Sequence, residues 1–174
     1  MSNPFVILAR ALSLARHRSK IEHAICPLSK CSKVTVLIDG TDSSAQACAD
    51  EANAFFGKRK LACQIFVINP SKEAPKEQVK GAQMILRKNI KWYGRAKRSK
   101  KHPYPDGKED LLINLLPEDN YTAHYASLCS MAKFKVGIYQ SGRKPLFDLL
   151  ISNTDNFSQV QIFAQIEAVL NSIV

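Results

Sequence analysis

The chain has 174 residues, of which 45% are apolar and 23% are charged, and its formal net charge is +10. This length is typical of a single α/β domain, 1–174, that can bury a core without disulfide or metal cross-links. No apolar run approaches the about 20 residues that cross a bilayer as a helix, so the sequence offers no transmembrane segment.

Residues 1–20 predict an N-terminal helix. Pro4 follows two polar residues, which is typical of a helix start. One face of this helix is apolar and consists of Phe5, Leu8, Leu12 and Ala15. We expect that face to pack on the domain or to meet a protein partner. The alternatives are an organelle-targeting segment and a helix lying on a membrane surface, because the segment contains arginine and no acidic residue.

Residues 34–68 predict a strand, a helix and a second strand. The β-branched run 34–38 is the first strand, 45–56 is the helix, and 63–68 is the second strand. A unit of this kind joins parallel strands through a right-handed crossover.

The middle of the chain is less regular. Residues 76–88 predict a second helix, although Gly81 costs it about 1 kcal/mol relative to alanine. We expect 87–108 to be mostly a surface loop, because glycine and proline interrupt it repeatedly. We call 87–108 the basic segment, for the reason given below.

The later part predicts three more strands and two more helices: strands at 110–116, 134–139 and 147–151, and helices at 120–132 and 158–174. The strands are short continuous apolar runs, which is typical of a sheet with helices on both faces. The predicted fold class is therefore α/β, a three-layer α/β/α sandwich with a mostly parallel sheet of about five strands, similar to Rossmann or flavodoxin topology. The phrase Asp-Leu-Leu-Ile occurs twice, at 110–113 and 148–151, and we interpret it as two strands with the same burial requirement.

The five cysteines indicate a reducing compartment. Their number is odd, and three of them lie within apolar periodic segments, where a thiol behaves as a small hydrophobic group. We therefore expect a cytoplasmic protein. His23, Cys26 and Cys31 have a spacing similar to metal ligands, but no second pair follows, and tetrahedral zinc needs four ligands. The sequence thus predicts no metal site.

The first candidate site follows the first strand. In an open parallel sheet, ligands bind beyond the carboxyl ends of the strands. We call the residues there the strand-one loop, and its candidate ligand-binding residues are Asp39, Gly40, Thr41 and Asp42. Gly40 would let the backbone approach a ligand, and the following helix offers N–H groups to an anion. The other strand ends bring Asn69, 117–120, 140–142 and 152–155 to the same edge.

Other interpretations of the strand-one loop stay open. Asp42 or Ser43 could cap the following helix, and a divalent cation could join Asp39 to a phosphate. The loop has no dinucleotide or phosphate-loop fingerprint, so the sequence implies no cofactor.

The basic segment is the second candidate site. It holds nine basic residues and one acidic residue, which accounts for most of the net charge. Cations interleaved with aromatic rings suit a phosphate backbone with stacked bases. The candidate polyanion-binding residues are Lys88, Lys91, Trp92, Arg95, Lys97, Arg98, Lys100 and Lys101. The alternative is a solvated loop that favours solubility, with Trp92 as a core anchor.

No catalytic residue can be assigned. The four histidines show no nucleophile–base pair in the sequence, and Asp110 and Asp148 open their strands, at the edge away from the usual site. The sequence therefore favours a binding protein over an enzyme.

Several phrases resemble a family of bacterial proteins, mainly from Bacteroidota, that is catalogued as a domain of unknown function. They lie within 30–174 and are Val36-Leu-Ile-Asp39, Lys91-Trp-Tyr-Gly94, Asp110–Leu115, Ala132–Gly137 and Phe147–Ile151. This resemblance implies a bacterial protein and no particular activity. In addition, Asp110–Leu115 and Ala132–Gly137 are similar to a piece of the acceptor-side domain of heptosyltransferases. Those enzymes need a second domain for which this chain has no room, so no catalytic residue is transferred.

Three hypotheses follow. The preferred one is a non-catalytic binding module whose basic segment contacts a polyanion such as RNA. The second is an enzyme or binding protein that takes a nucleotide or sugar phosphate at the strand-one loop. The third is a subunit of a larger assembly, which contacts its partner through a terminal helix.

Overall fold

The computed structural model describes residues 3–22, 24–72, 78–97, 108–117, 119–139, 146–153 and 155–173. Within these ranges the chain forms four α-helices, six strands and two short 3₁₀ turns. The helices are α1 (Pro4–His17), α2 (Ala45–Lys58), α3 (Tyr121–Cys129) and α4 (Gln159–Ser172). The strands are β1 (Lys33–Asp39), β2 (Ala62–Asn69), β3 (Gln83–Leu86), β4 (Leu111–Asn114), β5 (Phe134–Ile138) and β6 (Leu149–Ile151), and the 3₁₀ turns are η1 (Leu28–Lys30) and η2 (Arg87–Asn89).

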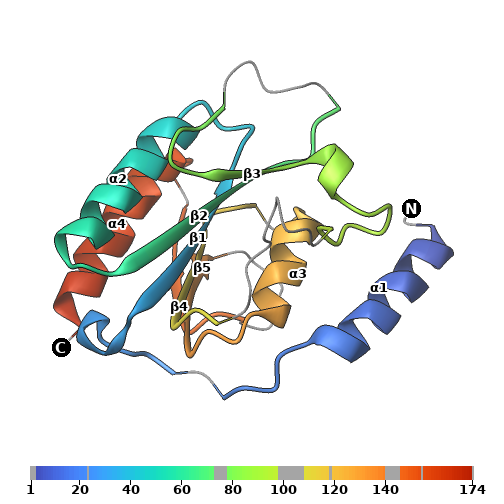
Figure 1. Cartoon of the computed structure of the whole chain (residues 1–174), viewed down its shortest axis with the longest axis horizontal. Coiled ribbons are helices and arrows are strands. Elements are labelled where there is room, and N and C mark those ends of the chain that lie inside the picture. The colour runs from blue at the N-terminus through green and yellow to red at the C-terminus, as the bar shows by residue number, and fades with distance from the viewer. Residues whose placement is uncertain are drawn as a thin grey trace.

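The six strands form one sheet in the order β3-β2-β1-β4-β5-β6, and every described pair of neighbours is parallel. This is the strand order of the Rossmann fold. Helices α2 and α4 cover one face, and α3 covers the other, with α1 lying outside α3 (Figure 1). The predicted three-layer α/β sandwich is therefore confirmed, with six strands where the sequence predicted about five.

The central strand β1 explains why its sequence is continuously apolar. Val34, Val36 and Ile38 belong to the core beneath α2 and α4, whereas Leu37 belongs to the core beneath α3. All four side chains are fully buried. Because successive side chains of a strand point to opposite faces, a strand covered on both faces needs apolar residues at consecutive positions.

The helix predicted at 76–88 is wrong, because Gln83–Leu86 forms the edge strand β3. Phe66 pairs with Gln83 and Asn69 with Leu86, and Ile85 is buried in the core beneath α3. Gly81 lies just before the strand with a φ of +73°, a left-handed conformation that glycine adopts readily and a helix does not use. The pairing with β2 thus overrides the helical pattern in the sequence.

Helix α1 begins at Pro4 as predicted, with the Asn3 side chain accepting a hydrogen bond from the Phe5 amide. The prediction that its apolar face packs on the domain is wrong. Phe5 is 73% exposed and Leu12 is 58% exposed, whereas Ser13 is buried against α3. The helix docks through polar and cation–π contacts on its other side, described below, so its apolar face points outward. Among the helices formed by the described residues, none is long and apolar enough to span a bilayer.

Candidate functional site

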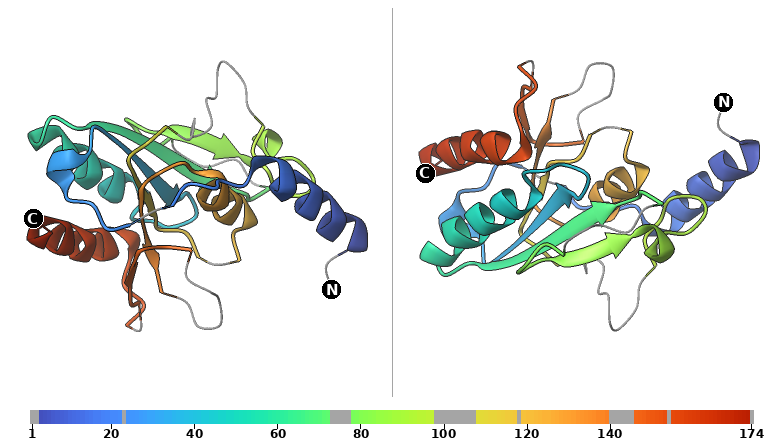
Figure 2. Two further views of the ribbon diagram at one scale, coloured as in Figure 1. Left: turned by 90° about the horizontal axis from the view of Figure 1, so that it is seen from below. Right: turned by 90° about the horizontal axis from the view of Figure 1, so that it is seen from above.

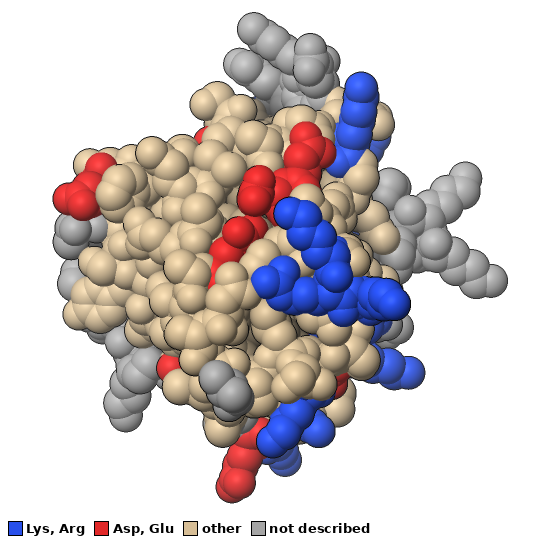
Figure 3. Space-filling model, turned by 90° about the vertical axis from the view of Figure 1, so that its left-hand side faces the viewer, with Lys and Arg blue, Asp and Glu red and all other residues tan. Residues whose placement is uncertain are grey.

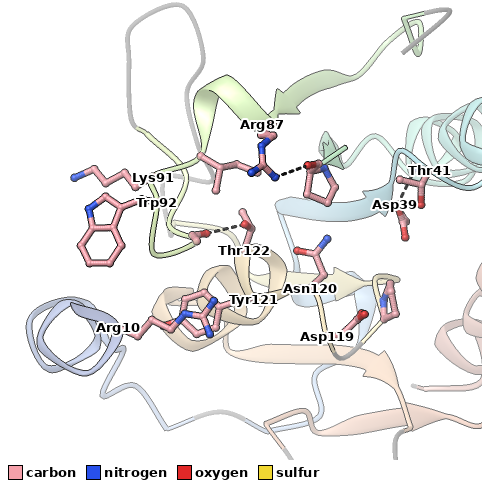
Figure 4. A pocket seen from close by; sticks show the side chains of 14 residues that line it. Arg10, Asp39, Thr41, Arg87, Lys91, Trp92, Asp119, Asn120, Tyr121 and Thr122 are labelled. Carbon is pink, nitrogen blue, oxygen red and sulfur yellow. Dashed lines mark hydrogen bonds between the residues drawn. The ribbon is translucent and has the colours of Figure 1, made fainter. Parts of the chain in front are cut away.

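The pocket of interest lies where the strand order of the sheet reverses. Strand β1 leads into α2 on one face, and its neighbour β4 leads into α3 on the other, so the chain diverges after these two strands. Ligands of open α/β sheets bind in the crevice at this point, outside the carboxyl ends of the strands. Here a pocket of about 500 Å³ opens, lined from α1, the ends of β1 and β2, the segment after β3, and the β4–α3 connection (Figure 4). We call it the carboxyl-edge pocket.

Three cations line this pocket: Arg10 of α1, and Arg87 and Lys91 of the segment after β3. The Arg10 Nε donates a hydrogen bond to the Tyr93 carbonyl at 3.0 Å, which ties α1 to the loop after β3. The Arg87 Nη1 donates to the Pro70 carbonyl at 3.4 Å. These contacts fix where the two arginine side chains lie, and each guanidinium keeps further N–H donors.

Aromatic rings accompany the cations. The Arg10 guanidinium lies 3.7 Å from the centroid of the Tyr121 ring, a cation–π contact. Burial raises the pKa of the Tyr121 hydroxyl, although the charge of Arg10 opposes this shift. Trp92, by contrast, is 69% exposed and stands edge-on to Tyr93, so the core-anchor interpretation does not apply to it.

A tight contact joins the loop after β3 to the start of α3. The Thr122 hydroxyl donates to the Gly94 carbonyl at 2.6 Å. Gly94 has a φ of +100°, and a Cβ there would come within 2.5 Å of the Tyr121 ring. Position 94 therefore requires glycine both for its backbone conformation and for this close approach. The two contacts place the cationic loop beside the amino terminus of α3.

The opposite wall of the pocket carries oxygen acceptors. The Asp39 carboxylate accepts bonds from the Thr41 amide and hydroxyl at 2.8 and 2.7 Å. The buried Gln159 side chain holds the Asp39 backbone by accepting from its N–H and donating to its carbonyl, at 2.7 and 3.0 Å. Asp119 and Asn120 also line the pocket, and the Asn120 side chain caps α3 by accepting from the Ala123 amide.

The structure divides the strand-one loop in two. Asp39 and Thr41 line the pocket, whereas Gly40 and Asp42 do not. Gly40 packs on β2 instead, because its N–H donates to the Ile68 carbonyl and a Cβ would lie 2.8 Å from the Val67 side chain. The close approach that glycine permits at this position is therefore to the neighbouring strand.

Asp42 serves the starts of two helices. Its carboxylate accepts from the amide and hydroxyl of Ser44, before α2, and from the amide of Gln159, the first residue of α4. Burial alone would raise the pKa of Asp42, but these hydrogen bonds outweigh it and hold the pKa below its ordinary value. Ser44, the residue that precedes α2, makes no capping bond with its own side chain. Asp42 thus stabilises the turn before α2, but the N-cap position is Ser44, so the prediction that Asp42 or Ser43 caps this helix is wrong.

The basic segment is also divided. Lys91 and Trp92 line the pocket, whereas Lys88, Arg95 and Lys97 lie outside it. The Lys97 ammonium donates to the Lys88 carbonyl at 2.8 Å, and the Arg95 guanidinium lies 5.6 Å from the Tyr125 ring centroid. The remaining candidates lie outside the described residues; they are Arg98, Lys100 and Lys101. Two candidate sites that are far apart in sequence thus meet at one pocket.

Arg10 and Arg87 are the charged pocket residues that sequence reasoning missed. Arg87 belonged to the basic segment but was not a candidate, and nothing in the sequence connects Arg10 to the end of β1. Their position follows from the strand order and from the docking of α1. Positive charge also occurs away from the pocket, since Lys and Arg gather beside Asp and Glu on the side that carries α2 and α4 (Figure 3). An excess of positive charge therefore does not by itself distinguish the pocket from the rest of the surface; the particular residues that line it do.

The cysteines are free throughout the chain. Burial raises the pKa of the Cys31 thiol to about 12, with the nearby Cys26 and Asp110 adding to the shift. The described residues contain no group of three or more histidine, cysteine or carboxylate side chains placed to hold a metal ion. His23, the first residue of the zinc-like spacing, lies outside the described residues.

The fold and the pocket together define a parallel α/β protein with Rossmann strand order and a concave site at the carboxyl edge of its sheet. The chain belongs to a family of unknown function (DUF6913), whose model matches residues 9–172. No curated protein and no solved structure matches it. The resemblance to a family of unknown function is thus confirmed, whereas the local similarity to heptosyltransferases finds no support in these comparisons.

Proposed function

We propose that the carboxyl-edge pocket binds a small phosphorylated ligand, a nucleotide or a sugar phosphate. The observation that carries this proposal is the convergence of Arg10 of α1 with Arg87 and Lys91 of the segment after β3 on one pocket of about 500 Å³. That volume falls in the range of small-molecule sites, and the position is the one where open α/β sheets bind ligands. The amino terminus of α3, at Tyr121 and Thr122 of the lining, adds a positive partial charge to the pocket.

The acidic residues of the pocket support a ligand with hydroxyl groups. A polyphosphate alone would be repelled by Asp39 and Asp119, which line the pocket with the cations. Carboxylate and amide oxygens instead accept hydrogen bonds from sugar hydroxyls. A sugar or nucleoside directed toward Asp39, Asp119 and Asn120, with its phosphate toward the cations, satisfies both charges.

RNA binding by the basic segment is the second candidate. One observation favours it, namely the 69% exposure of Trp92, which leaves its ring open to stacking on a base. Lys88, Lys91 and Lys97 are exposed in the same segment and could follow a phosphate backbone. For either ligand we propose a cytoplasmic location, because all five cysteines are free thiols.

A thermal-shift panel followed by titration calorimetry tests the proposal. The probes are inorganic phosphate, adenosine and guanosine mono- and diphosphates, uridine diphosphate glucose, glucose 6-phosphate and a short unstructured RNA. We expect at least one small phosphorylated probe to stabilise the protein. Arg87→Gln with Lys91→Gln should weaken that probe about tenfold or more, because two charge-assisted hydrogen bonds are lost.

The control variant separates the two candidates. Lys88→Gln with Lys97→Gln removes the same charge from two exposed positions of the basic segment but no residue of the pocket lining. These changes should leave binding of the small probe unchanged and should weaken RNA binding if it occurs. The proposal is contradicted if none of the small probes binds, or if the control variant loses affinity for them as strongly as the pocket variant.

A further inference from the structure

We propose that α1 docks on the surface of an anionic lipid membrane. Its outward side carries the apolar face predicted from the sequence, and Phe5, Leu8 and Leu12 are 73%, 57% and 58% exposed there. Figure 2 shows α1 projecting from the body of the molecule. Three large apolar side chains on one face of an exposed helix are unusual on a soluble protein surface and mark an interaction site.

The orientation of α1 is fixed by contacts on its inner side. The Ser13 hydroxyl lies 2.9 Å from the hydroxyl of Tyr125, and both side chains are buried. The Arg10 guanidinium is held by the Tyr93 carbonyl and the Tyr121 ring. A helix held by these polar contacts cannot turn its apolar face inward without leaving polar groups unpaired. The contacts that dock α1 therefore also keep its apolar face exposed.

The charge around this face selects an anionic lipid over a second copy of the chain. Residues 1–21 contain four arginine and lysine residues and no acidic residue. Arg16, Arg18 and Lys20 are exposed at the carboxyl end of α1. A second copy packed through the same helix would bring like charges together with no carboxylate on the helix to pair with them. Each cation near an anionic leaflet instead strengthens binding about fivefold.

Trp92 is a further exposed aromatic residue near α1. Its exposed ring lines the same pocket as Arg10 of α1, and Figure 4 shows Trp92 on the side of the pocket toward that helix. Tryptophan favours the level of the lipid headgroups, where its ring is half in the apolar phase. This inference does not depend on what the carboxyl-edge pocket binds.

Co-sedimentation of the full chain with large unilamellar vesicles tests the inference. The vesicles are pure phosphatidylcholine, or phosphatidylcholine with about one third phosphatidylglycerol. We expect binding to the anionic vesicles, with at least tenfold weaker binding to the neutral ones and in about 0.5 M salt. Leu8→Glu with Leu12→Glu should reduce binding to the anionic vesicles at least tenfold. Arg16→Gln, Arg18→Gln and Lys20→Gln together should reduce it to a similar extent.

Matched controls separate this docking from general attraction of a basic protein. Ile25→Glu with Met131→Glu changes the charge equally at apolar side chains that are 57% and 50% exposed elsewhere. Lys30→Gln, Lys58→Gln and Lys133→Gln remove three exposed cations away from α1. Both controls should keep most of the binding, and circular dichroism should show every variant folded.

Three outcomes would overturn the inference. The first is no binding to anionic vesicles. The second is an equal loss in the controls, which would mean attraction by net charge alone. The third is a dimer in sedimentation velocity that Leu8→Glu and Leu12→Glu dissociate while vesicle binding is absent, which would make a second copy the occupant.

Discussion

At the scale of single residues, two aspartates hold the amino edge of the sheet with the same pattern of bonds. The Asp110 carboxylate accepts from the Lys33 amide, and the Asp110 amide donates to the Lys33 carbonyl, at 3.1 and 2.8 Å. Asp148 makes the same pair of bonds with Lys135, both at 2.8 Å. The doubled phrase Asp-Leu-Leu-Ile therefore marks two strands, β4 and β6, that begin in the same way beside a neighbour.

Removing the Asp110 carboxylate should destabilise the protein in a pH-dependent manner. Hydrogen bonds from the backbone and side chain of Ser32 lower the pKa of Asp110. Because its folded pKa lies below the unfolded value of about 3.9, its stabilisation is complete above that value and is lost as pH falls through the folded pKa. The carboxylate is partly exposed, so we expect Asp110→Asn to cost about 1 kcal/mol at neutral pH.

Urea unfolding of the wild type and Asp110→Asn at pH 7 and near pH 3 measures this effect. The difference in unfolding free energy should shrink at the lower pH. Asp155→Asn, at an exposed position, should change stability by less than about 0.5 kcal/mol. An equal difference between wild type and Asp110→Asn at both pH values would show that the carboxylate charge does not stabilise this edge.

At the scale of elements, helices α2 and α4 form the firmest layer. Phe163 of α4 is fully buried, and its ring lies 6.1 and 6.2 Å from the rings of Phe55 and Phe56 of α2. The rings meet edge to face, a favourable arrangement of aromatic quadrupoles. The layer on the other face is formed by the shorter α3, on which α1 packs.

Phe163→Ala should therefore cost about 3–5 kcal/mol of unfolding free energy, through lost burial and the cavity left between the helices. Phe5→Ala makes the same chemical change on a helix, but at a side chain that is 73% exposed. It should cost less than about 0.5 kcal/mol. Chemical denaturation of the wild type and both variants measures these two changes in unfolding free energy. A similar loss of unfolding free energy in Phe163→Ala and Phe5→Ala would contradict the claim that α2 and α4 form the more tightly packed layer.

These elements also show how far sequence reasoning extends. Strands β1, β2, β4 and β5 could be predicted because burial on both faces leaves continuous apolar runs in the sequence. The edge strand β3 could not, because four residues with a helix-compatible composition carry no period that distinguishes the two structures. The apolar face of α1 was found correctly, but amphipathicity does not say what covers a face.

At the scale of the whole molecule, the carboxyl edge brings together α1 and the segments that follow β1, β2, β3 and β4. Asp39 and Thr41 could be predicted, because a loop after a central parallel strand lies at this edge in any strand order. Arg10 could not, because its place depends on polar contacts of α1 with the loop after β3. The pocket is therefore a product of the tertiary fold, and the two candidate sites in the sequence are parts of it.

The most direct test of the central claim is a nuclear magnetic resonance titration of the labelled protein with inorganic phosphate and then with adenosine diphosphate. If the carboxyl-edge pocket binds phosphorylated ligands, the largest amide shifts will lie at 39–41, 91–94 and 120–122, and Arg87→Gln with Lys91→Gln will reduce them. The amides at 58–61, which precede β2 at the opposite edge, will not move. Shifts confined to other surfaces, or no saturable shift at all, would contradict the account.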